Sequence, residues 1–142
     1  VLEEQSIEYG FVLFFICNHC PYVQAITSEI ADVTTKLTAS GIPTYAVMSN
    51  NYHFVTADSL PYMQSFAAEH QFTFPYLLDE SQSVAREYGA VCTPDIFGFA
   101  ADRSMQYRGC IEDLASAMEI IKDTGRGPES QRPSQGCSIK WK

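Results

Sequence analysis

The sequence predicts an α/β fold with a mixed central β-sheet and helices on both of its faces. An unbroken apolar run over residues 11–16 is typical of a strand that is buried on both sides. A helical pattern and a second apolar strand follow it, and such a βαβ unit places its two strands side by side and parallel. A later β-hairpin pattern adds antiparallel strands, and a final amphipathic helix follows the hairpin.

The first half of the chain supplies the βαβ unit. The first strand is predicted over residues 10–17. Apolar residues then recur every three or four positions, which predicts one continuous amphipathic helix over residues 21–39. Pro21 suits the first turn of this helix, because no N–H is needed there. Ser40 and Gly41 end the helix, and the second strand is predicted over residues 42–49.

A polar loop at residues 50–58 leads into the next helix, and Asp58 and Ser59 are the two candidates for its N-cap. A short strand is then predicted over residues 74–78. Asp79 is expected to cap a short helix, with Gln82 as its capping-box partner.

The second half of the chain ends in a hairpin, a helix and a tail. The hairpin strands are predicted at residues 96–101 and 105–109, and the last helix follows them. We expect one domain over residues 1–142, in which residues 124–142 form a C-terminal tail. The tail is rich in Gly, Pro and Ser until residue 135 and then turns apolar, so its end is expected to dock on the domain.

The chemistry is predicted at the end of the first strand. Cys17 and Cys20 flank Asn18 and His19, and Pro21 follows directly. The free N–H groups and the dipole of a helix N-terminus favour a thiolate there. The C-x-x-C spacing therefore predicts a redox-active dithiol that can close to a disulfide. His19 either eases thiolate formation or is a solvated spacer, and both interpretations stay open.

Metal binding is the alternative chemistry for this motif. A structural zinc site needs a second pair of ligands, and the sequence has no other C-x-x-C. A soft ion such as Cu(I) could be held by Cys17 and Cys20 with His19 or His53. We nevertheless expect no resident metal. We also expect no nucleotide or flavin cofactor, since no Gly-rich phosphate loop is present.

The composition indicates which kinds of partner and which cellular compartment to expect. The net charge of −8 over 142 residues argues against nucleic-acid binding, and no apolar run is long enough to span a membrane. Five cysteines, an odd number, suit a reducing compartment, so a cytoplasmic location is expected. The chain starts almost on its first strand, and a natural N-terminus further upstream would leave a periplasmic or exported location open.

Several segments together resemble a known family. They are FICNHCPYV, the loop ending SNN, FTFPYLLDE, AREYGAVCTPDIF, YRG and the terminal GCSIKWK. With them the chain resembles the thioredoxin-like branch of the alkyl hydroperoxide reductase/thiol-specific antioxidant (AhpC/TSA) proteins. The resemblance implies a thioredoxin-like fold in which Pro94 is a cis-proline that faces the C-x-x-C motif. The backbone of Thr93 would then lie beside the sulfurs and bind an extended substrate chain.

The resemblance also implies a function. We expect thiol–disulfide exchange, in which Cys17, as the more exposed sulfur, attacks a disulfide and Cys20 then releases the product. The substrate would be a disulfide-bearing protein or a small thiol compound, with an upstream reductant, and the protein would be a monomer or a homodimer. Cys92 and Cys137 are possible third thiols, although packing is the preferred interpretation of both. A peroxiredoxin-like thiol peroxidase is the alternative enzyme, but Cys17 occupies the position of its Thr or Ser.

Overall fold

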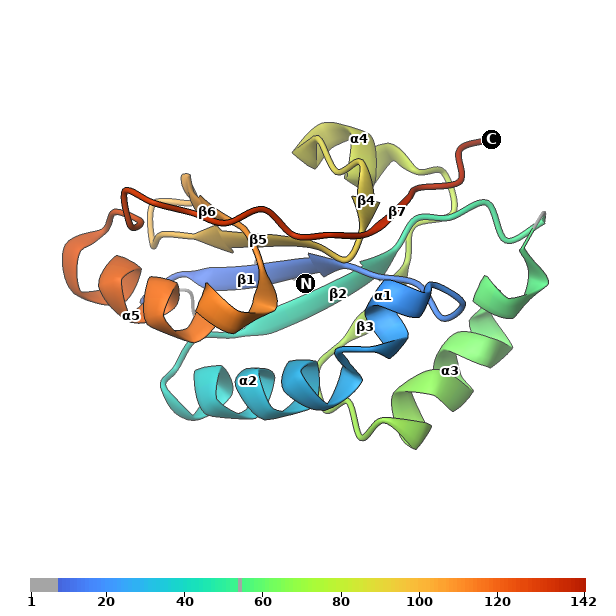
Figure 1. Cartoon of the computed structure of the whole chain (residues 1–142), viewed down its shortest axis with the longest axis horizontal. Coiled ribbons are helices and arrows are strands. Elements are labelled where there is room, and N and C mark those ends of the chain that lie inside the picture. Colours follow the sequence, from blue (N-terminus) through green and yellow to red (C-terminus); the bar gives the residue numbers. More distant parts are fainter. Residues whose placement is uncertain (1–7, 54) are drawn as a thin grey trace.

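The computed structural model describes residues 8–53 and 55–142. Its main sheet has five strands in the order β3-β2-β1-β5-β6 (Figure 1). The strands are β1 (Phe11–Phe15), β2 (Thr44–Met48), β3 (Tyr76–Leu78), β4 (Cys92–Thr93), β5 (Asp95–Phe99), β6 (Met105–Arg108) and β7 (Cys137–Ser138). The helices are α1 (Pro21–Gln24), α2 (Thr27–Ala39), α3 (Leu60–Glu69), α4 (Ser83–Tyr88) and α5 (Leu114–Thr124), with short 3-10 turns at Thr56–Asp58 and Ile111–Asp113.

The sheet is mixed, as predicted. β1 lies at its centre, parallel to β2 and antiparallel to β5. β3 extends the parallel side and β6 extends the antiparallel side. The predicted βαβ unit and hairpin are therefore both present.

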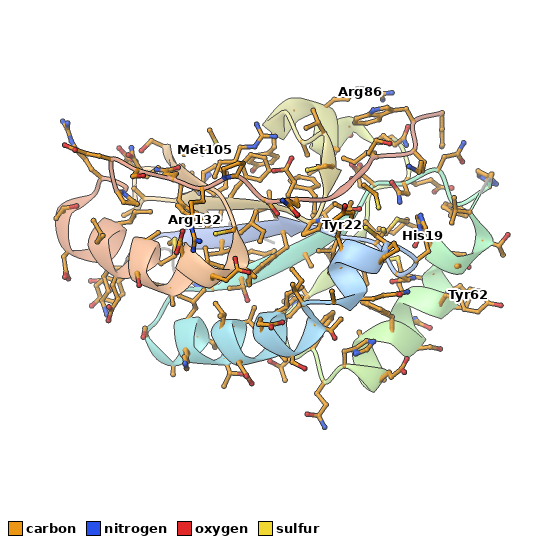
Figure 2. All side chains as sticks on the ribbon, viewed as in Figure 1. His19, Tyr22, Tyr62, Arg86, Met105 and Arg132 are labelled. Atoms are coloured by element: carbon orange, nitrogen blue, oxygen red, sulfur yellow. The ribbon has the colours of Figure 1, made fainter. Side chains whose placement is uncertain are left out.

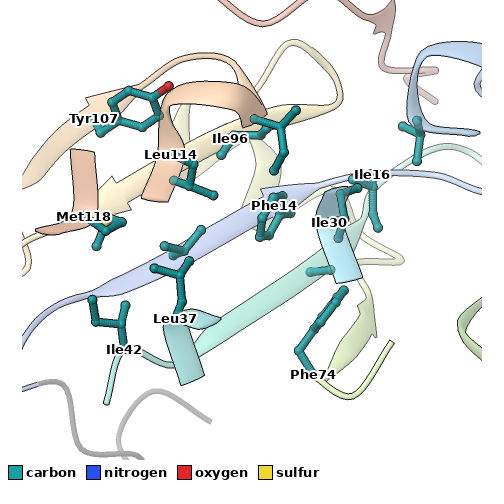
Figure 3. Close-up of a cluster of buried hydrophobic side chains, with 14 of the residues drawn as sticks. Phe14, Ile16, Ile30, Leu37, Ile42, Phe74, Ile96, Tyr107, Leu114 and Met118 are labelled. Carbon is teal, nitrogen blue, oxygen red and sulfur yellow. The ribbon is translucent and has the colours of Figure 1, made fainter. Parts of the chain in front are cut away.

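The residues of β1 alternate between two apolar clusters, which explains why the run has no polar interruption. Val12 and Phe14 pack against α2, α3 and α5 on one face, where Phe14 lies among Ile30, Leu37 and other side chains (Figure 3). Phe11, Leu13 and Phe15 belong to the cluster on the other face, which is covered by α4 and by Ile139 of the C-terminal segment. The expectation of helices on both faces is confirmed.

The helix predicted over residues 21–39 is interrupted. Ile26 is the N-cap of α2, with φ −118° and ψ 15°, and its N–H bonds to the carbonyl of Val23. The apolar spacing does not reveal this break, because Val23, Ile26 and Ile30 remain on the same buried side of the two helices.

Two of the predicted caps need correction. Ser59, not Asp58, is the N-cap of α3, and its side chain makes no capping bond. The N-cap of α4 is Gln82 rather than Asp79, although the Asp79 carboxylate accepts the N–H groups of Val84 and Ala85 in the first turn. Gln82 is not its capping-box partner, because its amide donates to carbonyls of Ser49 and Lys140 instead.

The C-terminal segment docks on the domain, as expected. β7 pairs with β4 in a separate antiparallel ladder, and Ile139 is buried. Figure 1 shows this segment, in red, passing beside β4. Within the described residues, none of the helices has the length and apolar character that a membrane crossing would need.

Candidate active site

Cys20 lies at the N-terminus of α1. It is the N-cap residue, with an extended backbone, and Pro21 opens the helix. Its carbonyl accepts the N–H of Gln24, at 2.9 Å, in the first turn. Its sulfur is thus held next to N–H groups that have no partner within the helix.

The Thr93–Pro94 loop faces both motif cysteines. The peptide bond between Thr93 and Pro94 is cis, as the family resemblance implied. The Cys20 thiol donates to the Thr93 carbonyl across 3.2 Å, and the Cys17 sulfur lies 3.3 Å from the Thr93 hydroxyl. The structure therefore brings Cys17, Cys20, Thr93 and Pro94 together, although they come from two distant stretches of the chain.

The two motif thiols differ in acidity rather than in exposure. Both residues are 0% exposed, so the expectation that Cys17 is the more exposed one is wrong. Burial raises the pKa of Cys17 to about 12, outweighing a hydrogen bond with Thr93. Burial raises the pKa of Cys20 as well, but its hydrogen bonds with the Cys137 thiol and the Val23 backbone outweigh burial, so the pKa of Cys20 is lowered. Cys20 is the thiol that ionises more readily.

Cys137 comes close to Cys20 from the other end of the chain. The two sulfurs are 2.9 Å apart, although 117 positions separate the residues. The hydrogen bond between the two thiols raises the pKa of Cys137. The tail that carries Cys137 is held in place by β7, which forms a ladder with β4.

Asp58 organises the loop between Cys17 and Cys20. Its Oδ1 accepts the backbone N–H groups of Asn18, at 2.8 Å, and of His19, at 3.2 Å. Its Oδ2 accepts from the His19 ring Nδ1 and from the Asn50 amide. The sequence alone does not reveal this role, because an acid just before a helix matches the N-cap pattern.

The side chains of Asn18 and His19 hold the same loop from other sides. The Asn18 amide donates to the carbonyl of Ala57 and accepts from the Tyr76 hydroxyl. The His19 side chain is 27% exposed and lies just before α1, the helix that carries Tyr22 (Figure 2). His19 is therefore not a free solvated spacer, because both its backbone N–H and its ring bind Asp58.

An ion pair between Asp95 and Arg108 stabilises the chain next to Pro94. Asp95, directly after Pro94, is buried and accepts two hydrogen bonds from the Arg108 guanidinium, at 3.1 and 2.7 Å. Asp95 also accepts the N–H of Val91. In the sequence, the two residues appeared only within separate family fragments, Asp95 in AREYGAVCTPDIF and Arg108 in YRG.

Cys92 is a weaker candidate for a reactive thiol. Its sulfur points toward the carbonyl of Pro94, at 3.5 Å. Burial is the main reason that the pKa of Cys92 rises to about 11. This environment fits a packed thiol better than a nucleophile.

One group of side chains in the described part of the chain could hold a metal ion. Ligand atoms of Cys17, His19 and Asp58 all lie within 4.8 Å of one another. Sulfur and imidazole ligands suit soft or borderline ions. Cys20 and His53, which the Cu(I) hypothesis included, are not members of this group.

A cavity of about 670 Å³ adjoins the site. Its walls include Tyr22 of α1, Pro94, and tail residues Ser134 and Gln135. A volume of this size is in the range of small-molecule pockets.

Comparison with protein families agrees with this geometry. The AhpC/TSA family profile matches residues 3–111. The chain belongs to the AhpC/TSA family. As an AhpC/TSA protein it carries the Cys20–Pro21 junction and the cis-Pro94 loop within the matched part, whereas Cys137 lies beyond it. No curated protein sequence matches the chain.

Solved structures show where this AhpC/TSA protein is similar to others. An uncharacterized conserved protein from Geobacillus kaustophilus is 37% identical, with a TM-score of 0.93 over 99% of this chain and 82% of that one. A hypothetical protein from Sinorhizobium meliloti is 30% identical, with a TM-score of 0.94 over 99% and 84% of the two chains. A secreted Mycobacterium tuberculosis disulfide oxidoreductase is 16% identical, with a TM-score of 0.65 over 80% and 84%, and this likeness establishes the thioredoxin-like fold alone.

Proposed function

We propose that this protein is a thiol–disulfide oxidoreductase whose attacking group is the Cys20 thiolate. The single observation that carries this proposal is the position of the Cys20 sulfur at the N-terminus of α1, 3.2 Å from the Thr93 carbonyl of the cis-proline loop. The lowered pKa of Cys20 supports the same assignment. This reverses the order of attack expected from the sequence, in which Cys17 acted first.

The remaining site residues take supporting roles in this proposal. Pro21 begins the helix that stabilises the thiolate. Thr93 and Pro94 form the surface beside which the substrate sulfur docks. Cys17, buried against the Thr93 hydroxyl, positions that loop, and His19 with Asn18 fixes the motif backbone through Asp58. The electrons come from an upstream thiol reductant, and no cofactor is required.

The proposal is tested by comparing Cys20→Ser with Cys17→Ser. Turnover of hydroxyethyl disulfide is measured in the presence of a thiol reductant, with circular dichroism as the check on folding. We expect Cys20→Ser to abolish turnover and Cys17→Ser to retain a measurable part of it. Undiminished turnover by folded Cys20→Ser would end the assignment.

Metal binding is the second candidate function, because Cys17, His19 and Asp58 converge. Asp58 already accepts four hydrogen bonds, and an ion would have to replace some of them. Metal analysis of protein purified under reducing conditions decides the question. A stoichiometric ion that is lost in His19→Ala would favour this function.

Peroxidase activity is the third candidate, and its supporting observation is the Thr93 hydroxyl beside the Cys17 sulfur. A hydroxyl at that point could position a peroxide for a thiolate. Stopped-flow reduction of hydrogen peroxide separates this activity from disulfide exchange. A rate no greater than that of free cysteine would exclude it.

A further inference from the structure

The C-terminal strand occupies the edge at which an extended substrate would bind. In the β4–β7 ladder, Cys137 is opposite Thr93 and Ser138 is opposite Cys92. The backbone N–H of Ile139 continues this contact by donating to the Val91 carbonyl, at 3.0 Å. The chain's own tail thus adds a strand to the loop on which strand addition by a substrate was expected.

Gly136 allows the tail to approach this closely. A Cβ atom at position 136 would lie 2.3 Å from the Thr93 carbonyl oxygen and 3.0 Å from the Pro94 nitrogen. Both are backbone atoms, which cannot move aside as a flexible side chain can. The absence of a side chain at Gly136 is therefore necessary for the observed docking.

Residues on both sides of Cys137 anchor the segment. Before it, the Ser134 hydroxyl donates to the Pro94 carbonyl, at 3.0 Å. After it, Lys140 donates its N–H to the Asn50 side chain and accepts from the Asn51 N–H. The Cys137 sulfur is thereby held at one point on the cis-proline loop, 2.9 Å from the Cys20 sulfur.

We propose that Cys137 is the thiol that closes a disulfide with Cys20, and that the docked tail makes a low-molecular-weight disulfide, rather than a polypeptide, the substrate. This inference rests on the proposed function and names the partner of its attacking thiol. A covalent S–S bond is about 2.0 Å long, so the two sulfurs need to approach by only about 0.9 Å. The 670 Å³ cavity beside Pro94 and Ser134 offers room for the rest of a small oxidant.

The reaction has two exchanges. The Cys20 thiolate attacks one sulfur of R–S–S–R, that S–S bond breaks, and R–S⁻ leaves and takes a proton from solvent. Cys137 then loses its proton to solvent and attacks the Cys20 sulfur, which releases the second R–S⁻. Two thiols of the protein have been oxidised to one disulfide and R–S–S–R has been reduced to two R–SH. A dithiol reductant restores the protein.

Peptide mapping can identify the disulfide directly. The full chain is reduced, treated with one equivalent of hydroxyethyl disulfide, quenched with acid and N-ethylmaleimide, and digested with trypsin without reduction. Cys17 and Cys20 remain in one peptide that ends at Lys36, whereas Cys137 is in the peptide 127–140, because Pro133 blocks cleavage after Arg132. We expect these two peptides to be cross-linked. A disulfide within the Lys36 peptide, or a cross-link to the Cys92 peptide 87–103, would overturn the inference.

Variants separate this inference from the proposed function. Cys137→Ala should accumulate the mixed disulfide on Cys20, whereas Ser138→Ala, a control at the exposed neighbouring position, should resolve it as the natural chain does. If Cys137→Ala still forms an intramolecular disulfide at Cys20, the inference fails and the proposed function stands. If Cys137→Ala forms no adduct on Cys20, the proposed function fails as well.

Two further measurements test the role of the tail. Gly136→Ala should slow the closure of the disulfide by about tenfold or more while circular dichroism stays unchanged, since the tail can no longer seat on Thr93. The natural chain should reduce hydroxyethyl disulfide at least about tenfold faster than the disulfides of insulin. Equal rates on the two substrates would overturn the substrate class.

Discussion

His19 contacts the carboxylate of Asp58 twice, through its backbone N–H at 3.2 Å and through its ring Nδ1. The same carboxylate is fully buried and also binds the N–H of Asn18. The loop that separates Cys17 from Cys20 is thus fixed by one acid from a different part of the chain. Asp58 therefore influences the positions of the two thiols through the backbone of this loop and not by contact with the Cys20 sulfur.

Replacing Asp58 by Asn should destabilise the protein by about 2–3 kcal/mol, because an amide N–H₂ would face N–H donors in a buried site. The free energy of unfolding in urea measures the effect. Ser59→Ala is the matched control on the next residue, and it should cost less than about 0.5 kcal/mol because Ser59 makes no side-chain capping bond. Equal losses in the two variants would contradict the role given to Asp58.

Replacing Arg108 by Ala should lower the free energy of unfolding far more than replacing Arg132 by Ala. Arg108→Ala leaves the buried Asp95 carboxylate without its cation, and we expect the free energy of unfolding to fall by about 2–3 kcal/mol. This loss is smaller than that for fully buried ion pairs, because the Arg108 side chain is 40% exposed. Arg132→Ala breaks an ion pair with Asp113 in which Arg132 is 66% exposed, and only a small loss of stability is expected because solvent screens the pair. Thermal or urea unfolding of both variants gives the comparison. An Arg132→Ala loss as large as that of Arg108→Ala would refute the ranking.

The pH dependence of alkylation should differ between the two motif cysteines. The lowered pKa of Cys20 means that its thiolate persists below the ordinary thiol range and is lost as the pH falls through that lowered value. Cys17, with a pKa of about 12, stays protonated throughout the neutral range. Iodoacetamide labelling, localised by fragmentation of the Lys36 peptide, should therefore find Cys20 first.

Cys137→Ala extends this pH experiment, because it removes the hydrogen bond that helps to lower the pKa of Cys20. The midpoint of Cys20 labelling should move to higher pH, while that of Cys17 stays in place. Labelling of Cys17 before Cys20 in the natural chain would be incompatible with the assigned order of acidity.

Ile139 should control how tightly the tail covers Cys20. Ile139→Ala removes buried apolar volume from the cluster beneath α4, so we expect a loss of about 2–4 kcal/mol and faster labelling of Cys20. Trp141→Ala is the control on the same tail. Trp141 is exposed, and its ring stacks with the Arg86 guanidinium at 4.9 Å, so a loss of about 1 kcal/mol or less is expected. Unchanged Cys20 labelling in Ile139→Ala would show that the tail does not limit access.

Local signals in the sequence determined the framework of this protein. The apolar run in β1 required burial on both faces, Pro21 marked the start of a helix, and these two features together located Cys17 and Cys20 at the strand–helix junction. The hairpin and the last helix were predictable for the same reason, since their patterns depend on neighbouring residues alone. The break at Ile26 was not predicted, because apolar spacing does not reveal a turn that keeps the buried side unchanged.

The tertiary structure alone decided which groups meet the thiols. Asp58 reaches the motif from 40 residues away and Cys137 reaches it from 117 residues away, so no local pattern could pair them with Cys20. Their positions follow from the packing of a loop and a tail against the finished sheet. The acidity of each cysteine was decided in the same way, because burial and hydrogen-bond donors from distant segments set it, whereas the C-x-x-C spacing is the same for both.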